Sequence, residues 1–363
     1  MYEIPKYVYP DFEKDFLKNA PDATFVISEK DGVVPDNFHA TTIYPTFVKI
    51  KGEWKLIKKS RMDCVIVLRG GEPYTVEFRN VKKGDPVAVG RSERGENGIY
   101  VDFDAFLTTE SGDEDSKFAF RQGRSRESSY SQDYDKLYDI LRHDREKGNI
   151  LWVMGPACVF DHDSRKAFAN LAKNGYVDGV LAGNAFGTHD LEGGYFHTAL
   201  GQDIYTKRSI PNGHYHHIEV LNRVRREGSV KAFLEKYQIN DGVMATLESR
   251  NIPYVLAGSI RDDGPLPCVY SDAYAAQDAM RALVSKATTI IALATQLHTI
   301  ATGNMTPCYF CEEDGSLRPT FFYSVDISEF AVNKLRDRGS LSVNTIVTNI
   351  QDFLVQIERN LIK

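Results

Sequence analysis

Cysteine is scarce in this sequence: 5 residues are scattered through 363 positions, an odd number without regular spacing. This pattern excludes a disulfide-stapled secreted domain and is typical of proteins from a reducing compartment. Long apolar runs are also missing, because no stretch approaches the roughly 20 residues that a membrane-spanning helix needs. The N-terminal region has no apolar stretch of the kind found in signal peptides. We therefore predict a cytoplasmic protein that does not associate with membranes.

An excess of positive charge is absent as well. The 50 Asp and Glu residues outnumber the 44 Lys and Arg residues, which gives a net charge of -6. Since nucleic-acid binding depends on a basic surface, we do not expect DNA or RNA as a partner. Apolar residues make up 42% of the chain and charged residues 26%, a composition typical of globular proteins, and the length is enough for two domains.

Two kinds of pattern divide the chain near residue 125. Before that point, short runs rich in β-branched and aromatic residues alternate with turn signals, which predicts a small antiparallel β domain over residues 1–125. Apolar residues at helical spacing predict a linker helix within residues 126–149. From residue 150 to residue 363, apolar strands alternate with amphipathic helices, which predicts a parallel sheet covered on both faces. The strands that we expect in this sheet cover residues 150–154, 177–182, 254–258, 289–295, 321–325 and 343–348.

The usual dinucleotide fingerprint, G-x-G-x-x-G, is also missing from the chain. Ligands of an open α/β sheet bind beyond the carboxyl ends of the strands, and the strands predicted here end in polar or tight segments. Gly155 and Gly183 follow two of these strands, where the backbone can approach a phosphate closely, and Pro156 and Ala157 continue the first turn. We therefore predict a Rossmann-like domain that holds a nucleotide through other backbone amides, as in the variant sheet of deoxyhypusine synthases and sirtuins.

Asp326 closes another predicted strand, in F-Y-S-V-D-I. An acidic residue at this place can accept hydrogen bonds from the ribose hydroxyls of an adenosine. The alternative is that Asp326 or Ser328 caps the helix that follows. Taken together with the two glycines, the pattern favours a nucleotide site.

The stretch V-L-A-G-S-I-R-D-D-G-P-L-P (255–267) places one cation and two anions at the end of a core strand, namely Arg261, Asp262 and Asp263. Two carboxylates beside an arginine suit a substrate with ammonium groups and proton transfer, although Asp before Gly is also a common turn former. His189 and His298 follow two other strand ends. Their imidazoles suit proton shuttling near neutral pH, with a purely structural role as the alternative.

Two segments resemble metal sites without completing one. H-Y-H-H (214–217) opens a predicted helix, and its third ligand would have to come from a distant part of the sequence. Cys308 and Cys311 have C-x-x-C spacing, but no second pair accompanies them. We therefore predict no metal.

Three blocks of the sequence carry a family resemblance: N-F-H-A-T-T-I-Y-P-T-F-V-K-I (37–50), G-Y-V-D-G-V-L-A-G-N-A-F-G-T-H-D-L-E (175–192) and the 255–267 stretch. They resemble segments of the archaeal-type ornithine cyclodeaminases, which share a region with proteins labelled lysine-oxoglutarate reductase/saccharopine dehydrogenase. The resemblance implies a small β domain, a Rossmann-like domain that binds NAD, and conversion of L-ornithine to L-proline and ammonia. The NAD contacts that it implies are Asn184, Ala185, Asp263, Thr295, Gln296, Leu297, His298, Asp326 and Asn349.

The resemblance also suggests roles for the charged turn. Asp262 and Asp263 would balance the two ammonium groups of the substrate, or act with His189 and Asp190 as proton acceptors, and Arg261 would bind its carboxylate. NAD would be reduced and reoxidised within one turnover and would stay bound. Two alternatives remain open: an NAD-dependent amino-acid dehydrogenase or imine reductase, which would consume NADH steadily, and a non-catalytic NAD-sensing protein.

The chain departs from the family pattern in several places. Asn349 stands where an acid is expected after the last strand, and Phe160-Asp161 stand where a histidine is expected, with His162 displaced. Residues 105–117 and 308–320 resemble insertions. These departures bear on the substrate more than on the cofactor, so another basic amino acid is an alternative to ornithine. We also expect a homo-oligomer.

Overall fold

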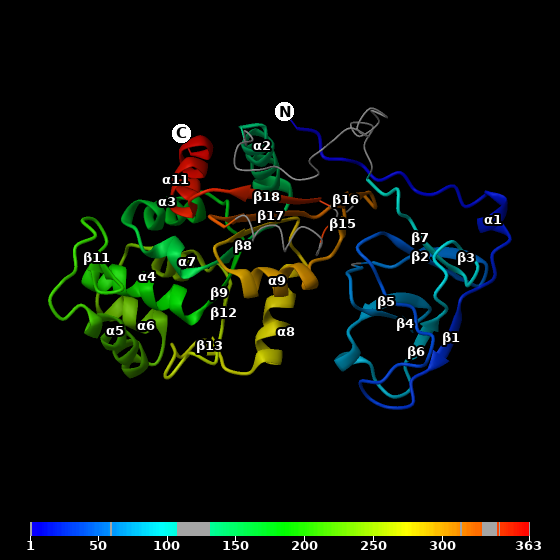
Figure 1. Ribbon diagram of the computed structural model, residues 1–363, viewed down its shortest axis with the longest axis horizontal. Helices are drawn as coiled ribbons and strands as arrows, with labels where there is room; N and C mark the ends of the chain where they lie inside the picture. The colour runs from blue at the N-terminus through cyan, green and yellow to red at the C-terminus, as the bar shows by residue number, and fades with distance from the viewer. Residues whose placement is uncertain are drawn as a thin grey trace.

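The computed structural model describes residues 2–58, 60–106, 131–312, 314–328, 340 and 342–362. Figure 1 shows antiparallel strands gathered at one end of the molecule, and a larger sheet with its helices at the other end. These two groups of elements follow each other along the chain. The arrangement confirms the predicted fold class, a small antiparallel β part followed by a Rossmann-like parallel sheet.

The N-terminal part is built from two antiparallel sheets. Its elements are α1 (Asp15–Lys18), β1 (Thr24–Ile27), β2 (Thr46–Ile50), β3 (Glu53–Leu56), β4 (Val65–Arg69), β5 (Glu72–Val76), the 3-10 helix η1 (Phe78–Asn80), β6 (Pro86–Val89) and β7 (Ile99–Val101). One sheet has four strands in the order β1-β6-β4-β5, and the other has three in the order β3-β2-β7. Val48 and Ile99 of the second sheet pack against Ile66 and Ala88 of the first. Buried residues of the two sheets thus form a core between them.

The C-terminal part is a seven-stranded parallel sheet. Its strands are β8 (Ile150–Met154), β9 (Gly179–Gly183), β12 (Tyr254–Ala257), β13 (Val269–Tyr270), β14 (Thr289–Leu293), β17 (Phe321–Asp326) and β18 (Ser342–Val347). Their order in the sheet is β13-β12-β9-β8-β14-β17-β18. Without the short edge strand β13, this is the order 3-2-1-4-5-6 of a Rossmann sheet. The direction of the winding changes between β8 and β14, so a ligand crevice is expected between their carboxyl ends.

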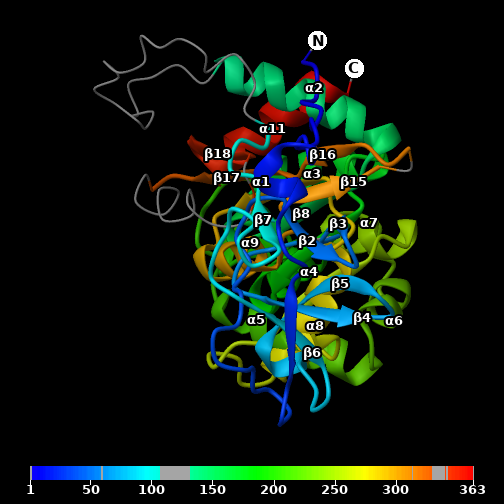
Figure 2. The same ribbon diagram turned by 90° about the vertical axis from the view of Figure 1, so that its right-hand side faces the viewer.

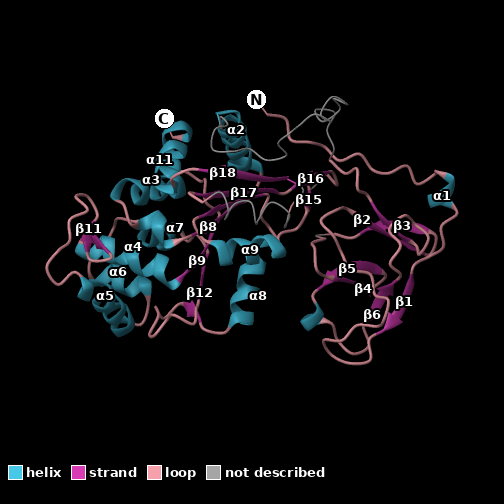
Figure 3. Ribbon diagram, viewed as in Figure 1, coloured by secondary structure: helices cyan, strands magenta, loops and turns pink. Residues whose placement is uncertain are grey.

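Helices cover both faces of the parallel sheet. They are α2 (Ser131–Lys147), η4 (Pro156–Val159), α3 (His162–Lys173), α4 (Asn184–Phe196), α5 (His214–Glu227), α6 (Val230–Lys236), α7 (Val243–Arg250), α8 (Ala273–Val284), α9 (Gln296–Met305) and α11 (Ile350–Leu361). Trp152 and Met154 of β8 pack in the larger core with residues of α2, α3, α7 and α11, whereas Leu151 and Val153 face α8 and α9. Figure 3 shows α8 and α9 together on one side of the sheet. Because both faces are buried, the strand I-L-W-V-M is continuously apolar.

The two chain termini lie along the same edge of the molecule, the upper one in Figure 1. Figures 1 and 2 both show α2 and α11 side by side there, and Tyr134 of α2 packs on Phe353 of α11 with ring centroids 5.8 Å apart. No helix in the described ranges combines the length and apolar character needed to cross a membrane.

The second predicted insertion, residues 308–320, contains a hairpin of β15 (Tyr309–Cys311) and β16 (Leu317–Pro319). This hairpin touches the N-terminal part. The Tyr309 hydroxyl donates a hydrogen bond to the Ile57 carbonyl, and the Tyr7 N–H donates to the Leu317 carbonyl at 3.2 Å. The first predicted insertion lies largely outside the described residues. The domain boundaries at residues 125 and 149 stay predictions.

Candidate active site

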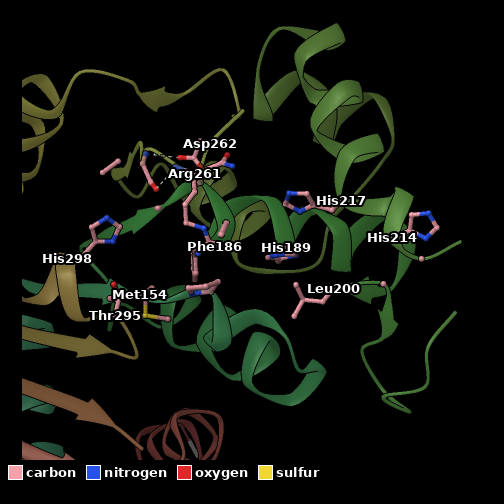
Figure 4. Close-up of a pocket in the computed structure, with 18 residues that line it drawn as sticks. Met154, Phe186, His189, Leu200, His214, His217, Arg261, Asp262, Thr295 and His298 are labelled. Atoms are coloured by element: carbon pink, nitrogen blue, oxygen red, sulfur yellow. Dashed lines mark hydrogen bonds between the residues drawn. The ribbon is translucent and has the colours of Figure 1, made fainter. Parts of the chain in front are cut away.

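A cavity of about 520 Å³ opens where β8, β9 and β12 end. Figure 4 shows Arg261 and Asp262 between His298 on one side and His189 and His217 on the other. The predicted site residues that line it are Pro156, Asn184, Ala185, His189, Arg261, Asp262, Thr295 and His298. They come from four different segments of the chain, so the strand ends do converge on one hollow.

Gly155 marks the closest approach between the end of β8 and the end of β14. Its N–H donates to the Leu293 carbonyl at 2.8 Å. A Cβ atom at this position would lie only 2.1 Å from the carbonyl oxygen of Ala294. Because no side chain tolerates such a distance, only glycine fits here without a shift of the backbone. Gly155 thus holds the two strand ends together at the base of the crevice.

The N-terminal ends of α4 and α9 both open onto the cavity. Gly183 precedes α4 and has no side chain with which to cap it, and Thr295 makes no side-chain capping bond to α9 within the described chain. The first N–H groups of a helix lack intrahelical partners and carry partial positive charge, so they bind anions well. The floor of the cavity therefore suits a diphosphate group.

The charged turn after β12 lies between this cavity and a second one of about 470 Å³. Arg261 and Asp262 line both cavities, whereas Asp263 lines the second. Asp262 Oδ2 accepts the Ser259 N–H at 2.8 Å. This carboxylate therefore shapes the turn, as the alternative interpretation held, and also faces the cavity.

His189 lies on α4 and its ring is almost completely buried. Its Nδ1 is 2.9 Å from Glu192 Oε2, and its ring centroid is 4.8 Å from that of His217 on α5. Burial opposes ionisation of Glu192, but hydrogen bonds from His189, Thr198 and the Gly201 N–H outweigh it and lower the pKa of the carboxyl. His189 thus faces the cavity with a carboxylate behind it, which suits proton transfer.

Glu192 was not predicted as a site residue, and His217 was considered only as part of the H-Y-H-H segment. Glu192 follows His189 at a spacing that places two residues on one face of a helix, and this signal was available in T-H-D-L-E. The ligand atoms of His189, Glu192 and His217 lie within 4.8 Å of one another, a grouping that could hold a metal ion. Only His217 of the H-Y-H-H segment belongs to this group, and the other two residues come from α4.

The structure gives Asp190 a different task from the proton transfer that we expected. Its Oδ1 accepts Arg165 Nε at 2.7 Å, and its two oxygens accept the N–H groups of Val243 and Met244 at 2.9 and 2.7 Å. Asp190 is fully buried and does not line the cavity. It caps α7 and neutralises a buried arginine, and its catalytic role stays a prediction that these contacts do not favour.

Several other predicted contacts lie away from the cavity lining, namely Gly155, Ala157, Gln296, Leu297, Asp326 and Asn349. Asp326 Oδ1 accepts the Ser328 N–H at 2.9 Å, a local turn of the kind that the capping alternative described. The side chain of His298, by contrast, lies at the cavity wall, where burial lowers its pKa and keeps the imidazole neutral near pH 7.

Asn349 caps α11, because its side chain accepts the N–H groups of Gln351 and Asp352. We expect Asn349→Ala to lower the free energy of unfolding by about 1 kcal/mol, since the helix loses this cap. Denaturant titration of the variant beside wild type measures the change. Asn349→Asp is the matched control, because aspartate caps equally well. Equal stability of the alanine variant would contradict the assignment.

Comparison with known proteins places the chain in a family. The family model described as arginine dihydrolase ArgZ-like, C-terminal, Rossmann fold matches residues 136–357, and its first-region companion matches residues 45–129. The ornithine cyclodeaminase of Archaeoglobus fulgidus is 38% identical over 348 residues, which cover 95% of this chain and 78% of the relative. The chain belongs to the ornithine cyclodeaminase family. This confirms the resemblance seen in the sequence.

Two solved structures resemble this ornithine cyclodeaminase-family chain along most of its length. A conserved LOR/SDH protein from Methanococcus maripaludis aligns with a TM-score of 0.84 at 35% identity, and the match covers 94% of this chain and 98% of that one. AgrE, solved as a ternary complex with ornithine and NAD+, aligns with a TM-score of 0.59 at 32% identity. That match covers 94% of this chain and 46% of AgrE.

The departure at residues 160–162 from the ornithine cyclodeaminase family pattern now has a structural setting. Phe160 packs edge-on against His189, with ring centroids 5.2 Å apart. Asp161 caps α3 by accepting the N–H groups of Asp163 and Ser164, and His162 packs on Tyr205 at 4.2 Å. An apolar ring therefore borders the candidate proton acceptor where the resemblance led us to expect an imidazole.

Proposed function

We propose that this chain converts L-ornithine to L-proline and ammonia, with NAD+ as a cofactor that is regenerated within each turnover. The observation that carries the proposal is the cavity at the carboxyl ends of the parallel strands, onto which two helix N-termini and a buried His–Glu pair open. Support comes from relatives that bear the name ornithine cyclodeaminase and from the complex of AgrE with ornithine and NAD+.

The residues around the cavity fit NAD+. The N–H groups at the starts of α4 and α9 would hold its diphosphate, with Gly183 leaving room for the backbone to approach. Asn184, Ala185, Thr295 and His298 line the same space. When bound, NAD+ supplies oxidation of the substrate α-carbon and the later reduction at the same carbon. Asp263, in the adjoining cavity, remains a proposed contact.

The substrate would lie between the charged turn and His189. Arg261 would bind the substrate carboxylate, and the Asp262 carboxylate would attract an ammonium group. His189 would accept the proton that the α-ammonium group must lose before the carbon can be oxidised. Phe160 and the cavity walls would keep water from this step, so that each charge acts strongly.

The direct test is to incubate the purified protein with NAD+ and ornithine, and separately with lysine or arginine. Ammonia and proline should appear from ornithine without net accumulation of NADH. Steady net NADH formation would indicate an amino-acid dehydrogenase instead. Binding of NAD+ without ammonia release from any of the three would indicate an NAD-sensing protein.

Gly183→Ala tests the cofactor site. The added Cβ would lie 3.1 Å from His298 Cε1, which is tight, so the His298 ring must move by a few tenths of an ångström. We expect NAD+ to bind about tenfold more weakly, which corresponds to about 1.4 kcal/mol. Titration of NAD+ by calorimetry measures the change. Ala275→Ser, at an exposed position on α8 that lines neither cavity, serves as the comparison. Unchanged affinity in Gly183→Ala would argue against this placement.

The cellular setting is also a proposal. We propose a cytoplasmic protein that forms a homo-oligomer and serves proline formation. Support for the oligomer comes from three apolar side chains that are largely exposed, those of Leu200, Ile260 and Leu297. Leu200 lines the cavity, and the other two each adjoin a residue that lines it. Light scattering of the purified protein gives the number of subunits.

A further inference from the structure

A chain of hydrogen bonds connects the H-Y-H-H segment at the start of α5 with His189. His216 Nδ1 lies 2.9 Å from Thr198 Oγ1, and this hydroxyl donates to Glu192 Oε1 at 2.8 Å. The other oxygen of Glu192, Oε2, meets His189 Nδ1 at 2.9 Å. Glu192 and Thr198 are fully buried, whereas His216 is half-buried and stacks on Phe196 at 4.2 Å.

The chemistry of these groups fixes the direction of each bond. Glu192 is ionised near neutral pH, because the hydrogen bonds that it accepts lower its pKa despite burial. A carboxylate only accepts hydrogen bonds, so His189 must carry its proton on Nδ1. The Thr198 hydroxyl has one proton, and it donates this proton to Glu192. His216 must therefore donate from Nδ1 to the threonine oxygen. This leaves Nε2 of His189 with a free lone pair.

We propose that Glu192 is a positioning residue, which fixes the His189 ring and its tautomer so that Nε2 can accept the substrate proton. Thr198, His216 and the Gly201 N–H hold Glu192 in place. The inference rests on the proposed function for its kinetic effect, but the tautomer of His189 is a property of the protein alone. A buried carboxylate behind an imidazole also stabilises the imidazolium that forms when the proton arrives.

The same residues could instead bind a metal ion, since His217 approaches within 4.8 Å and its Nδ1 is buried without a partner among the described atoms. The existing bonds disfavour this. Both oxygens of Glu192 are already engaged, by Thr198 and the Gly201 N–H on one and by His189 on the other. A metal bound to both His189 Nδ1 and Glu192 Oε2 would have to displace the Nδ1 proton and break the hydrogen bond between these two atoms.

Glu192→Gln tests the proposal kinetically. The side chain keeps its size, but the amide cannot stabilise the imidazolium. We expect kcat for ammonia release from ornithine to fall roughly 100-fold, while KM and NAD+ affinity stay near wild-type values. In a His189→Asn background, Glu192→Gln should cost little more, because the two residues act as one unit. The positioning role would be overturned if the double variant lost kcat by the product of the two single losses. A Glu192→Gln effect on KM alone would overturn it as well. Glu219→Gln, on the solvent side of α5 beside Arg223, is the control.

Nitrogen NMR of the 9 histidine rings tests the tautomer without any assay. The signals that His189→Asn removes should show a proton on Nδ1, and Glu192→Gln should move that proton or leave it exchanging between the two nitrogens. A His189 ring protonated on Nε2 in wild type would overturn the inference. Stoichiometric Zn²⁺ in the purified protein, or Zn²⁺ uptake that Glu192→Gln abolishes, would also overturn it. If the tautomer is as expected but ornithine yields no ammonia, the proposed function is wrong. The claim that Glu192 fixes the His189 tautomer would then still hold, but its kinetic consequence would not.

Discussion

Asparagine in place of His189 should lower kcat for ammonia release from ornithine by roughly 10²- to 10⁴-fold. The asparagine amide can still donate to Glu192, so the carboxylate keeps a partner and the fold should hold. What disappears is the lone pair that accepts the substrate proton. Steady-state ammonia release, measured beside NAD+ affinity and thermal unfolding, separates a loss of chemistry from a loss of structure.

The matched control for this variant is His197→Asn at the end of the same helix. His197 has a left-handed backbone conformation, with φ of 58°, and asparagine adopts that conformation readily. We therefore expect unchanged activity there. If His189→Asn retained most of its activity, the proton would have to reach another group, such as His298 or Asp262.

Asp190→Asn should lower the free energy of unfolding by about 3 kcal/mol, because it removes the anion from a buried ion pair. Arg165 is only 3% exposed and would keep Asp241 as its remaining carboxylate partner. The cap of α7 would also lose one acceptor, since an amide has a single oxygen. Denaturant unfolding measures the change, and the protein that remains folded should turn over ornithine at a rate close to wild type.

Asp163→Asn is the control for that experiment, because Asp163 is exposed on α3 and surface changes of this kind usually alter stability by less than about 0.5 kcal/mol. A stable but inactive Asp190→Asn variant would show that Asp190 takes part in the reaction after all. Substitutions at two neighbouring residues are thus expected to differ in effect: His189→Asn lowers activity, and Asp190→Asn lowers stability.

The parallel sheet was predictable because its central strands are largely apolar runs between helical patterns. Ile150–Met154 was placed to the residue, since a strand buried on both faces has no polar positions to blur its limits. The edge strand β13 was missed, because only Val269 and Tyr270 pair there and two residues give no periodic signal. The 309–319 hairpin was seen only as an insertion, since its partners lie far away in the sequence.

The site was predictable in part for a similar reason. Residues that directly follow strands, such as Asn184 and Thr295, reach the cavity because parallel strands end at one edge of the sheet. His189 and Asp190 could not both face it, because successive residues on a helix point about 100° apart. His217 reaches His189 through the packing of α5 on α4, and a tertiary contact of this kind leaves no trace in local spacing.

The hairpin of β15 and β16 has a practical consequence for anyone who wishes to study the two parts separately. Tyr309 and Leu317 lie in one buried cluster with Tyr7 and Phe47. A truncation near residue 125 would expose these apolar side chains to solvent on both fragments, and the exposed apolar surfaces would promote aggregation. Expression trials should therefore begin from the intact polypeptide, and a fragment that stays monomeric at high concentration would be a surprise.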